Sequence, residues 1–578
     1  MMTAPARQRS RLARRTALGL PVLLLLAVAL VGFALWRASA IVNPLLSDWA
    51  AKTVAEQSDG VYRLDLSPMR LNWLKRLVHV DSVRFTTNGA INARRARPRS
   101  DVTVALYNCT VSGVHIMTLA RGAGFVAESF GCRVGHVAVT AARRARDTTS
   151  ARDSTAGKSP RFLVLMERLK LPKSLPRMKI AQITFPALGF EFRMPHRRRG
   201  ETRLQFERLG WRMTDLAIDP TDSSAATRAL FSRNIELFGE NVVVHPDSTA
   251  ALSIGVLASN VSDSTLELGG ITYAPTQSPS ESARLNPKKR AYIKITARRT
   301  QVQGIDFGAL AWGEGVIARR VAVDSFWLEV TVTKTPSLTR HVRRSPQDWL
   351  ADLEQSVNVD SIVLHEGEVV YREHRPGYAH PGVITFAHLQ ATAVNVHHWD
   401  GRRSRGDAMT LTTTSYLQKA GRFDVQFTVP LDAPHFDMAF GGTLGAMPAK
   451  AFNDFVEEVF PWRIDKGDVA TIKFAAKVQN GVATGVITPI YRDLKVDVTG
   501  SGAKGILGAG GVVGSAARGI ASLAANVAKV NTNNPDDPDH PTKPPQVGVI
   551  RHIFTRSESL PAFLWASLRD GLLPVLKK

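Results

Sequence analysis

The sequence predicts a mostly β protein behind one N-terminal transmembrane helix, and three observations support this fold class. Beyond residue 60, polar and apolar residues alternate repeatedly, which is typical of half-buried strands. A twenty-residue segment without charge lies near the N-terminus. The chain has 578 residues but only two Cys, and its mean hydropathy is −0.07. These values exclude a disulfide-stapled miniprotein and a polytopic membrane protein.

The apolar segment Ala17–Trp36 is long enough to cross about 30 Å of hydrocarbon as a helix. The Arg-rich residues 1–16 before it favour a cytoplasmic N-terminus, with everything after Arg37 on the far side of the membrane. The alternative is a cleaved signal peptide, with Ala38-Ser39-Ala40 as its cleavage site. Because the apolar run exceeds the ~7–15 residues of a signal peptide core, we favour a retained anchor.

The formal net charge of +24 first suggests a polyanionic partner. Part of this charge comes from six Arg side chains that flank the apolar segment: Arg7, Arg9, Arg11, Arg14, Arg15 and Arg37. The remaining excess charge is spread along the chain, without a basic stripe interleaved with aromatic residues, so a solvated Arg-rich surface is favoured over a nucleic-acid site. We therefore expect no nucleic-acid partner.

Strand-like alternation is clearest in five segments, and helical periodicity appears in only a few short ones. The expected strands are Val102–Val111, Ala291–Arg298, Leu411–Leu417, Phe423–Val429 and Ile472–Val478. The expected helices are Asn43–Ser58, Ser345–Val357 and Pro448–Phe460, with a closing strand Val547–Phe554 followed by a helix at Ser559–Leu573. Surface linkers rich in Pro, Ser, Asp and Asn are expected at Arg143–Pro160, Ala274–Lys289 and Val530–Gln546.

A Val-Asp-Ser motif recurs before apolar residues. It begins at Val80, Val323 and Val359, and Lys179–Phe185 is a looser copy. We interpret the motif as a turn that leads into a strand in stacked structural units. Chance repetition is the weaker explanation.

The two cysteines, Cys109 and Cys132, both lie in strand-like sequence. A disulfide between neighbouring strands is one interpretation, and two buried free thiols is the other. Without a His pair at ligand spacing, they do not form a zinc site.

No group of residues in the sequence predicts catalysis, a metal site or a cofactor site. His397 and His398 are adjacent and would point to opposite faces of a strand. The polar residues His365, Glu366, Glu373 and His374 lie in Ile362–His374, which we interpret as an exposed hairpin with its turn at Gly367. The glycine-rich run Gly505–Gly514 lacks the dinucleotide-binding spacing. We therefore expect a protein that is not an enzyme and that has no catalytic, metal-binding or cofactor-binding residues.

The order of these segments resembles the AsmA-like envelope proteins of diderm bacteria. The similarity is strongest at Val357–Val498, which resembles an AsmA-related C-terminal domain of unknown function, and the tail Val547–Leu573 also resembles that family. The matching motif positions are structural: Ile362, Gly367, Tyr371, Gly442, Leu444, Met447, Gly467, Gly485, Pro489, Tyr491 and Leu494.

The resemblance implies an elongated, curved antiparallel β-sheet groove with a few short amphipathic helices. The expected division is a basic tail (1–16), a transmembrane helix (17–36), an N-terminal AsmA-like β region (38–345) and a C-terminal AsmA-like β domain (346–500). Residues 501–578 would hold a Gly/Ala-rich segment, a Pro/Asn linker and the closing strand with its amphipathic helix.

The expected function is that of an inner-membrane-anchored periplasmic protein which binds or guides lipids and supports maintenance of the outer membrane. Its partners would be phospholipid acyl chains, the inner membrane and other envelope proteins. The alternative function is an envelope scaffold or regulator of outer-membrane assembly that carries no lipid. A third alternative, an envelope hydrolase, would require clustered polar residues with perturbed pKa values in a cleft.

Overall fold

The computed structural model describes residues 51–94, 100–140, 177–196, 200–219, 232–281, 291–333, 356–398, 408–498 and 530–577, apart from short gaps within these ranges. The chain divides into two compact units. Unit 1 comprises residues 1–157, 165–198 and 204–237, and unit 2 comprises residues 158–164, 199–203 and 238–578. The expected transmembrane helix Ala17–Trp36 lies outside the described residues. Within the described part of the chain, no helix is long and apolar enough to cross a membrane.

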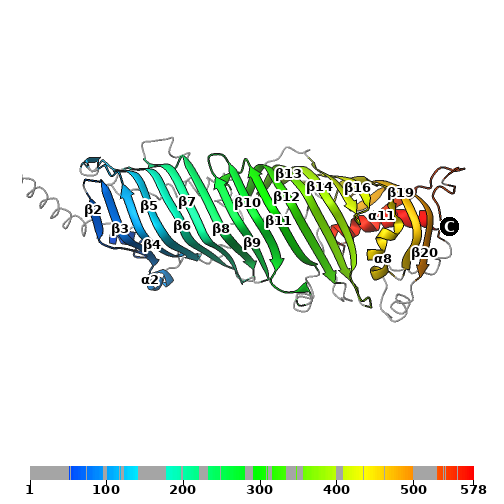
Figure 1. The fold of residues 1–578 in the computed structure, drawn as a ribbon, viewed down its shortest axis with the longest axis horizontal. Helices are drawn as coiled ribbons and strands as arrows, with labels where there is room; N and C mark the ends of the chain where they lie inside the picture. The colour runs from blue at the N-terminus through cyan, green and yellow to red at the C-terminus, as the bar shows by residue number, and fades with distance from the viewer. Residues whose placement is uncertain are drawn as a thin grey trace, which may run out of the picture. The chain divides into compact units, whose positions relative to one another are not determined.

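Unit 1 is built on strands that lie side by side in chain order (Figure 1). Strands β1 and β2 both pair antiparallel with β3, and β3, β4 and β5 continue in the same antiparallel way. The next pair, β5 and β6, is parallel. The elements are β1 (Tyr62–Leu66), β2 (Met69–Asn72), β3 (Leu77–Thr87), the short helix α2 (Gly89–Ala93), β4 (Asp101–Ser112), β5 (Phe125–Thr140), β6 (Met178–His196) and most of β7 (Gly200–Ile218).

Unit 2 contains a longer sheet, whose strands pair antiparallel from β9 to β12 and from β13 to β21. Strands β12 and β13 are parallel. The strands are most of β8 (Asn234–Asp247), β9 (Ala250–Asn260), β10 (Thr265–Pro275), β11 (Ala291–Gln303), β12 (Gly315–Thr333), β13 (Ser356–His374), β14 (Gly382–His398), β15 (Met409–Leu417), β16 (Gly421–Val429), β17 (Met438–Leu444), β18 (Met447–Pro448), β19 (Trp462–Gln479), β20 (Val482–Val498) and β21 (Gly548–Ile553).

The parallel strands β12 and β13 are joined by a segment that includes residues 345 and 346, and they are in register from Gly315 to Thr333 of β12. The expected division of the chain at these residues stays a prediction. The mostly β class with few helices is confirmed, with a sheet that is antiparallel-rich rather than purely antiparallel.

Two local predictions are wrong. The segment Ile362–His374 is not a hairpin, because β13 runs without a turn from Ser356 to His374. Gly367 lies in the middle of this strand, where the ring of Phe326 occupies the space that a Cβ atom would need. The helix expected to end at Val357 is also too long, since that residue already belongs to β13.

The Val-Asp-Ser motif also differs from its prediction, because all three copies lie inside strands rather than in turns. The pairs Val80–Cys109 and Ser82–Tyr107 place Asp81 opposite Asn108, whose φ is +52°. The pairs on either side of Asp360 place it opposite Asn395, whose φ is +59°. In β12 the motif's own Ser325 has φ +52°. Each motif therefore marks a corner where a strand passes through the left-handed region.

These corners change the spacing of apolar residues. On either side of Asp81, the side chains of Val78, Val80 and Val83 all pack against the same cluster. A straight strand would turn Val83 to the opposite face, because side chains alternate with a period of two. Val357, Val359 and Ile362 of β13 show the same spacing in a second cluster. An interval of three residues across the corner thus keeps apolar side chains on one face.

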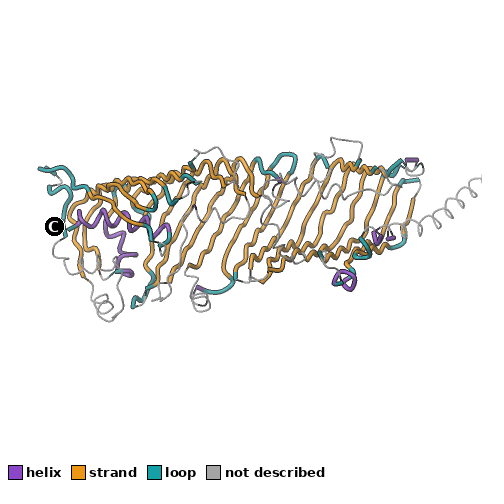
Figure 2. Tube along the Cα trace, turned by 180° about the vertical axis from the view of Figure 1, so that it is seen from behind, coloured by secondary structure: helices purple, strands orange, loops and turns teal. Residues whose placement is uncertain are grey.

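Helices cover part of the sheet at the C-terminal end of unit 2 (Figure 2). Helix α8 (Asn453–Val459), preceded by the 3-10 turn η3 (Ala449–Phe452), packs on β13, β14 and β19. Helix α11 (Leu560–Leu576) packs on β20 and β21. The predicted helices at Pro448–Phe460 and Ser559–Leu573 are confirmed, as is the closing strand, which is β21.

Glycine allows α11 to lie directly on β21. A Cβ atom at Gly548 would collide with the carbonyl oxygen of Gly571 in the helix. One at Gly571 would lie 2.7 Å from Ile487 Cγ2 and 2.9 Å from Ile550 Cγ1. Both values are shorter than real Cβ contacts, so the helix and the strand approach as closely as they do because both positions are glycine.

The corner in β4 yields a stability prediction. We expect Asn108→Val to destabilise the chain by about 1–2 kcal/mol relative to Asn108→Gly, because Val has a large steric penalty at positive φ and Gly has none. The measurement is the urea midpoint of the purified full-length chain in detergent. Thr103→Val, on the exposed side of the same strand, is the matched control and should change little. Equal midpoints for the two Asn108 variants would contradict the corner.

The contact between α11 and β21 yields a second prediction. Gly548→Ala should destabilise the chain by about 1–3 kcal/mol, because the added methyl group meets helix backbone that cannot move aside independently. The matched control is Gly89→Ala, where the new Cβ meets nothing within 4 Å. Urea unfolding measures both variants, and a Gly548→Ala midpoint no lower than that of the control would show that the helix does not lie on the strand in this way.

Candidate functional site

One face of the unit 2 sheet carries apolar side chains from strand to strand, and we call it the apolar face. Directly paired residues of neighbouring strands point to the same side of a sheet. One row of paired residues runs from Leu268 through Thr300 and Val323 to Leu364 on β13. It continues through Ala391, Thr413, Val425, Gly442, Phe474 and Ile487 to β20.

A second row lies beyond the corners on the same face. It pairs Tyr273 with Ile295, Ile295 with Leu328, and Leu328 with Val369. Val369 in turn pairs with Phe386, which pairs with Leu417. The residues that β10, β11 and β12 contribute to these two rows include no charged side chain. Among them, the hydrogen-bonding side chains are Tyr273 and Thr300, so this part of the face offers mainly dispersion contacts.

Burial of the apolar face differs between its two ends. Under α11, Val478, Ala483, Ile487, Ile550 and Phe563 are at most 2% exposed. On β11, in contrast, Ile293 and Ile295 are 38% and 37% exposed. The described helices that pack on the sheet contact β13, β14 and β19–β21. The apolar face is thus sealed at its C-terminal end and partly open to water along β10–β12.

The opposite face of the same strands is polar. Arg299 Nε lies 2.7 Å from Glu267 Oε1, and Arg372 Nε lies 3.7 Å from Glu329 Oε2. Lys294 Nζ stands 5.4 Å from the ring centre of Trp327. The hydrogen bond to Glu267 is the main cause that raises the pKa of Arg299. This face is accounted for by solvated ion pairs, each of which contributes little to stability.

Unit 1 has an apolar face of its own. Phe130 and Phe185 meet edge to face at 5.7 Å between ring centres, and Phe190 and Phe206 meet in the same way at 5.7 Å. Beside the first pair, the structure joins Cys109 of β4 and Cys132 of β5 in a disulfide. The two cysteines are directly opposite in the register and are 1% and 2% exposed. The disulfide therefore crosslinks the strands next to the corner at Asn108.

The C-terminal end of the apolar face contains a half-buried polar cluster, which lies between β21, α11 and the turn before the helix. His552 Nδ1 is 2.8 Å from Asp570 Oδ2 of α11, and His552 Nε2 is 3.2 Å from Glu558 Oε2. Arg569 Nη2 donates to Asp570 Oδ1 at 2.7 Å. The hydrogen bond to Asp570 raises the pKa of His552, although burial acts in the opposite direction. Burial works against ionisation of Asp570, but the bonds from His552 and Arg569 prevail and lower its pKa.

A second polar group is covered by α8. Glu373 accepts hydrogen bonds from Tyr371 Oη at 2.7 Å and from Arg375 Nε at 2.6 Å. The guanidinium of Arg375 also stands 5.4 Å from the ring centre of Phe460. Both of these partners hold the carboxylate of Glu373 in place, so we interpret the group as a packed ion pair.

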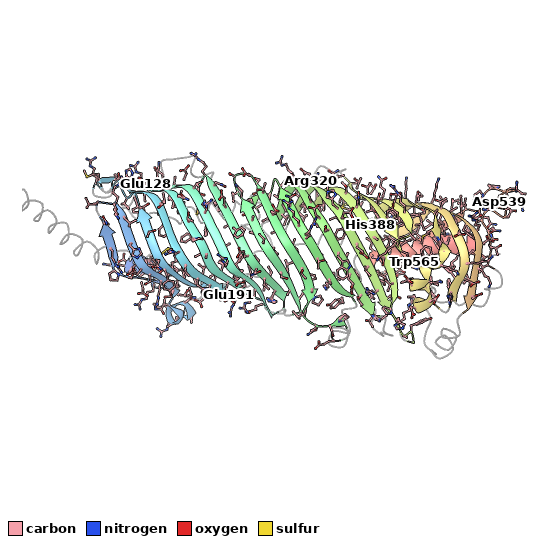
Figure 3. The ribbon with its side chains drawn as sticks, in the orientation of Figure 1. Glu128, Glu191, Arg320, His388, Asp539 and Trp565 are labelled. Carbon is pink, nitrogen blue, oxygen red and sulfur yellow. A yellow bond between two sulfur atoms is a disulfide. The ribbon has the colours of Figure 1, made fainter. Side chains whose placement is uncertain are left out.

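The remaining residues considered as candidates for chemistry are dispersed. His397 Nδ1 contacts Asn358 Oδ1 of β13, and His388 Nδ1 lies 3.5 Å from Glu366 Oε2 at an exposed corner. Figure 3 places His388 among the strands of unit 2. The glycine-rich run Gly505–Gly514 lies outside the described residues. Across the described part of the chain, no three His, Cys, Asp or Glu side chains are grouped as metal ligands.

The motif residues that carried the family resemblance are spread over five strands, with Met447 in β18. Ile362, Gly367 and Tyr371 lie in β13, Gly442 and Leu444 in β17, and Gly467 in β19. Gly485, Pro489, Tyr491 and Leu494 lie in β20. Burial raises the pKa of Tyr491 to about 12.

One expected linker is packed against the motif strand β20. Within Val530–Gln546, Asn534 is 1% exposed, and its backbone amide donates to the carbonyl of Tyr491 at 2.9 Å. Its side chain also binds the carbonyls of Pro489 and Gln546. This contact was not predicted from the sequence, because the abundance of Pro, Asn and Asp around Asn534 is typical of an exposed linker.

The His552 cluster was also missed from the sequence. Its members are separated by up to 18 residues, and only the close packing of α11 on β21 brings them together. A signal was available in the single His of the closing strand, which faces a helix containing one Asp.

Comparisons with known proteins do not assign the chain to a family. No protein family and no curated protein matches the sequence. Among solved structures, the chain has a weak similarity to the crystal structure of the sex pheromone staph-cAM373 precursor, with 8% identity and a TM-score of 0.11. That match covers 59% of this chain and 87% of the other. A TM-score this low carries no argument about fold or function.

Proposed function

We propose that this chain is a membrane-anchored, periplasmic lipid-binding protein of the cell envelope, whose apolar sheet face shields phospholipid acyl chains from water. The observation that carries the proposal is the partly open part of the apolar face on β10–β12, which has no charged side chain. The apolar segment Ala17–Trp36 and the AsmA-like resemblance support an anchor in the inner membrane.

The chemistry of the face favours an acyl chain over a protein segment as its occupant. A peptide laid on this surface would lose water from its backbone N–H and C=O groups, and side chains such as Ile295, Leu328 and Val323 offer them no partner. A hydrocarbon chain has no such groups. Each methylene group moved out of water contributes about 0.8 kcal/mol, so a chain of ordinary length would be held without a directional contact.

The size of the face is also suitable. The open part on β10–β12 spans about 10 Å across its three strands, which are spaced by about 4.8 Å. Along the strands it is longer, because the 13 residues of β11 extend at most roughly 40 Å, more than the hydrocarbon thickness of one leaflet, which is about half of ~30 Å. A phospholipid could lie along the strands with its head group in water, where Arg side chains bind phosphate.

The test is the amount of phospholipid that co-purifies with the full-length chain extracted in mild detergent, measured by native mass spectrometry. The wild-type chain should retain phospholipid. Ile295→Lys should reduce the retained amount roughly tenfold or more, because a charged amine on the apolar face must lose water when an acyl chain covers it.

Gln301→Lys, on the opposite face of the same strand, is the matched control for added charge and should retain lipid as the wild type does. A wild-type chain without phospholipid, or equal losses in both variants, would refute the proposed function. If photocrosslinking from position 295 captured protein and no lipid, the result would favour the scaffold function instead.

A further inference from the structure

The half-buried cluster around His552 connects the sheet to α11, the helix that covers one end of the apolar face. Shielding of an acyl chain does not require this cluster. Asp570 lies in α11, His552 lies in β21, and Glu558 lies in the turn that leads into the helix. The two ring nitrogens of His552 therefore connect β21 to α11, through Asp570, and to the turn before the helix, through Glu558. The side chains of the cluster are largely buried, with 14% of His552 and 30% of Asp570 exposed.

Helix α11 covers a continuation of the apolar rows. Val425, Phe474 and Ile487, which continue the row from Leu268 and Val323, pack in one cluster with Phe563 of α11. The helix supplies Leu564, Leu568 and Leu572 to the same cluster. Leucine side chains of the protein thus occupy the part of the face that follows the open strands. Trp565, 48% exposed, lies on the side of the helix turned away from the sheet (Figure 3).

The contacts of His552 require a proton on both ring nitrogens. Each nitrogen faces a carboxylate oxygen, and a carboxylate can only accept a hydrogen bond. The imidazolium form donates to Asp570 and Glu558 at once. Neutral imidazole donates to one of them and turns a lone pair towards the other. Loss of one proton therefore removes a bond between β21 and the helical segment.

The other charged group at the cluster does not replace that bond. Arg569 binds Asp570 from within the same helix, so it holds the carboxylate in place but does not cross to the sheet. On β20, the residue paired with His552 is Ala483, which carries no charge. The ring of Phe563, 5.6 Å away between centres, closes the remaining side. Among the residues that the structure describes, Glu558 and Asp570 are the charged groups that act on the ring.

We propose that α11 is a proton-controlled end cap of the apolar face, held down by doubly protonated His552 and loosened when His552 loses a proton. The inference rests on the proposed function only for what the uncovered face would bind, namely the same acyl chains. Apart from the cluster, α11 is held by its apolar contacts with the sheet and, at its C-terminal end, by the hydrogen bond from Asn531 N–H to the carbonyl of Leu576. We therefore expect the loosening to begin at the end of the helix next to Glu558.

The direction of the pH dependence follows from the raised pKa of His552. A raised folded-state pKa contributes stability that is complete below the ordinary value of about 6.5 and is lost as the pH rises through the folded-state value. The Asp570 carboxylate stays ionised over this range, because its pKa is lowered. The cap is therefore closed at mildly acidic pH and loosens towards alkaline pH.

Hydrogen exchange of the full-length chain in detergent tests the cap. Labelling times are scaled to the intrinsic exchange rate at each pH between 6 and 9, and peptides covering residues 560–576 are followed. Protection of these peptides should fall by about tenfold for each unit by which folding raises the pKa of His552. Peptides from β16 and β19 should keep their protection.

Three variants make the test specific. His552→Gln should show low protection at every pH, because its amide cannot become charged. Glu558→Gln should keep the pH response but move its midpoint to lower pH, since one of the two carboxylates is gone. The control His388→Gln removes an exposed His beside Glu366 and should behave as the wild type. If His552→Gln fails to fold, the midpoint shift in Glu558→Gln still decides the question.

Retained phospholipid is measured on the same samples, which separates the two proposals. Protection of α11 that does not change with pH, or a pH response unchanged by Glu558→Gln, overturns the cap and leaves lipid binding standing. A pH response of α11 in samples that contain no lipid supports the cap and refutes the proposed function. A pH response accompanied by changed lipid retention supports both.

Discussion

The structure depends on one constraint: long strands must bend while keeping their apolar side chains on a single face. A strand with strict alternation would send half of its apolar side chains to the wrong face after a bend. The left-handed residues Asn108, Ser325 and Asn395 resolve this conflict, because each of them resets the alternation at a corner. The disulfide next to Asn108 and the apolar rows of unit 2 both follow from this arrangement.

The apolar face also has a boundary problem, since a sheet that ended with an open apolar edge would invite aggregation. At the C-terminal end of unit 2, α11 solves this problem by covering β20 and β21 with its own leucines. Its close approach depends on two glycines, and a half-buried ionic cluster joins it to the sheet. Both close packing and electrostatic contacts thus hold the helix at this end of the sheet.

The sequence predicted the features that arise from local pattern. The mostly β class, the helices at Pro448–Phe460 and Ser559–Leu573, and the closing strand follow from periodicity and capping residues. It failed at the corners, where Val-Asp-Ser and Glu366-Gly367 have turn-like composition but lie inside strands. It also missed His552 and Asn534, because their partners are brought together by packing and not by spacing. The apolar face is implied by alternation, but its open and covered parts depend on where α11 docks.

The corner spacing has a consequence for how such a sheet changes in evolution. In β3, removal of Asp81 alone would leave Val78, Val80 and the former Val83 at intervals of two. The apolar side chains of β3 would then alternate as in a straight strand, but β4 would still carry Asn108 opposite the deletion. A straight pair would need the matching deletion in β4 as well, because the register of the two strands is shared. Curvature in this architecture can thus be gained or lost by insertions and deletions that are matched between neighbouring strands, without any substitution in the apolar pattern.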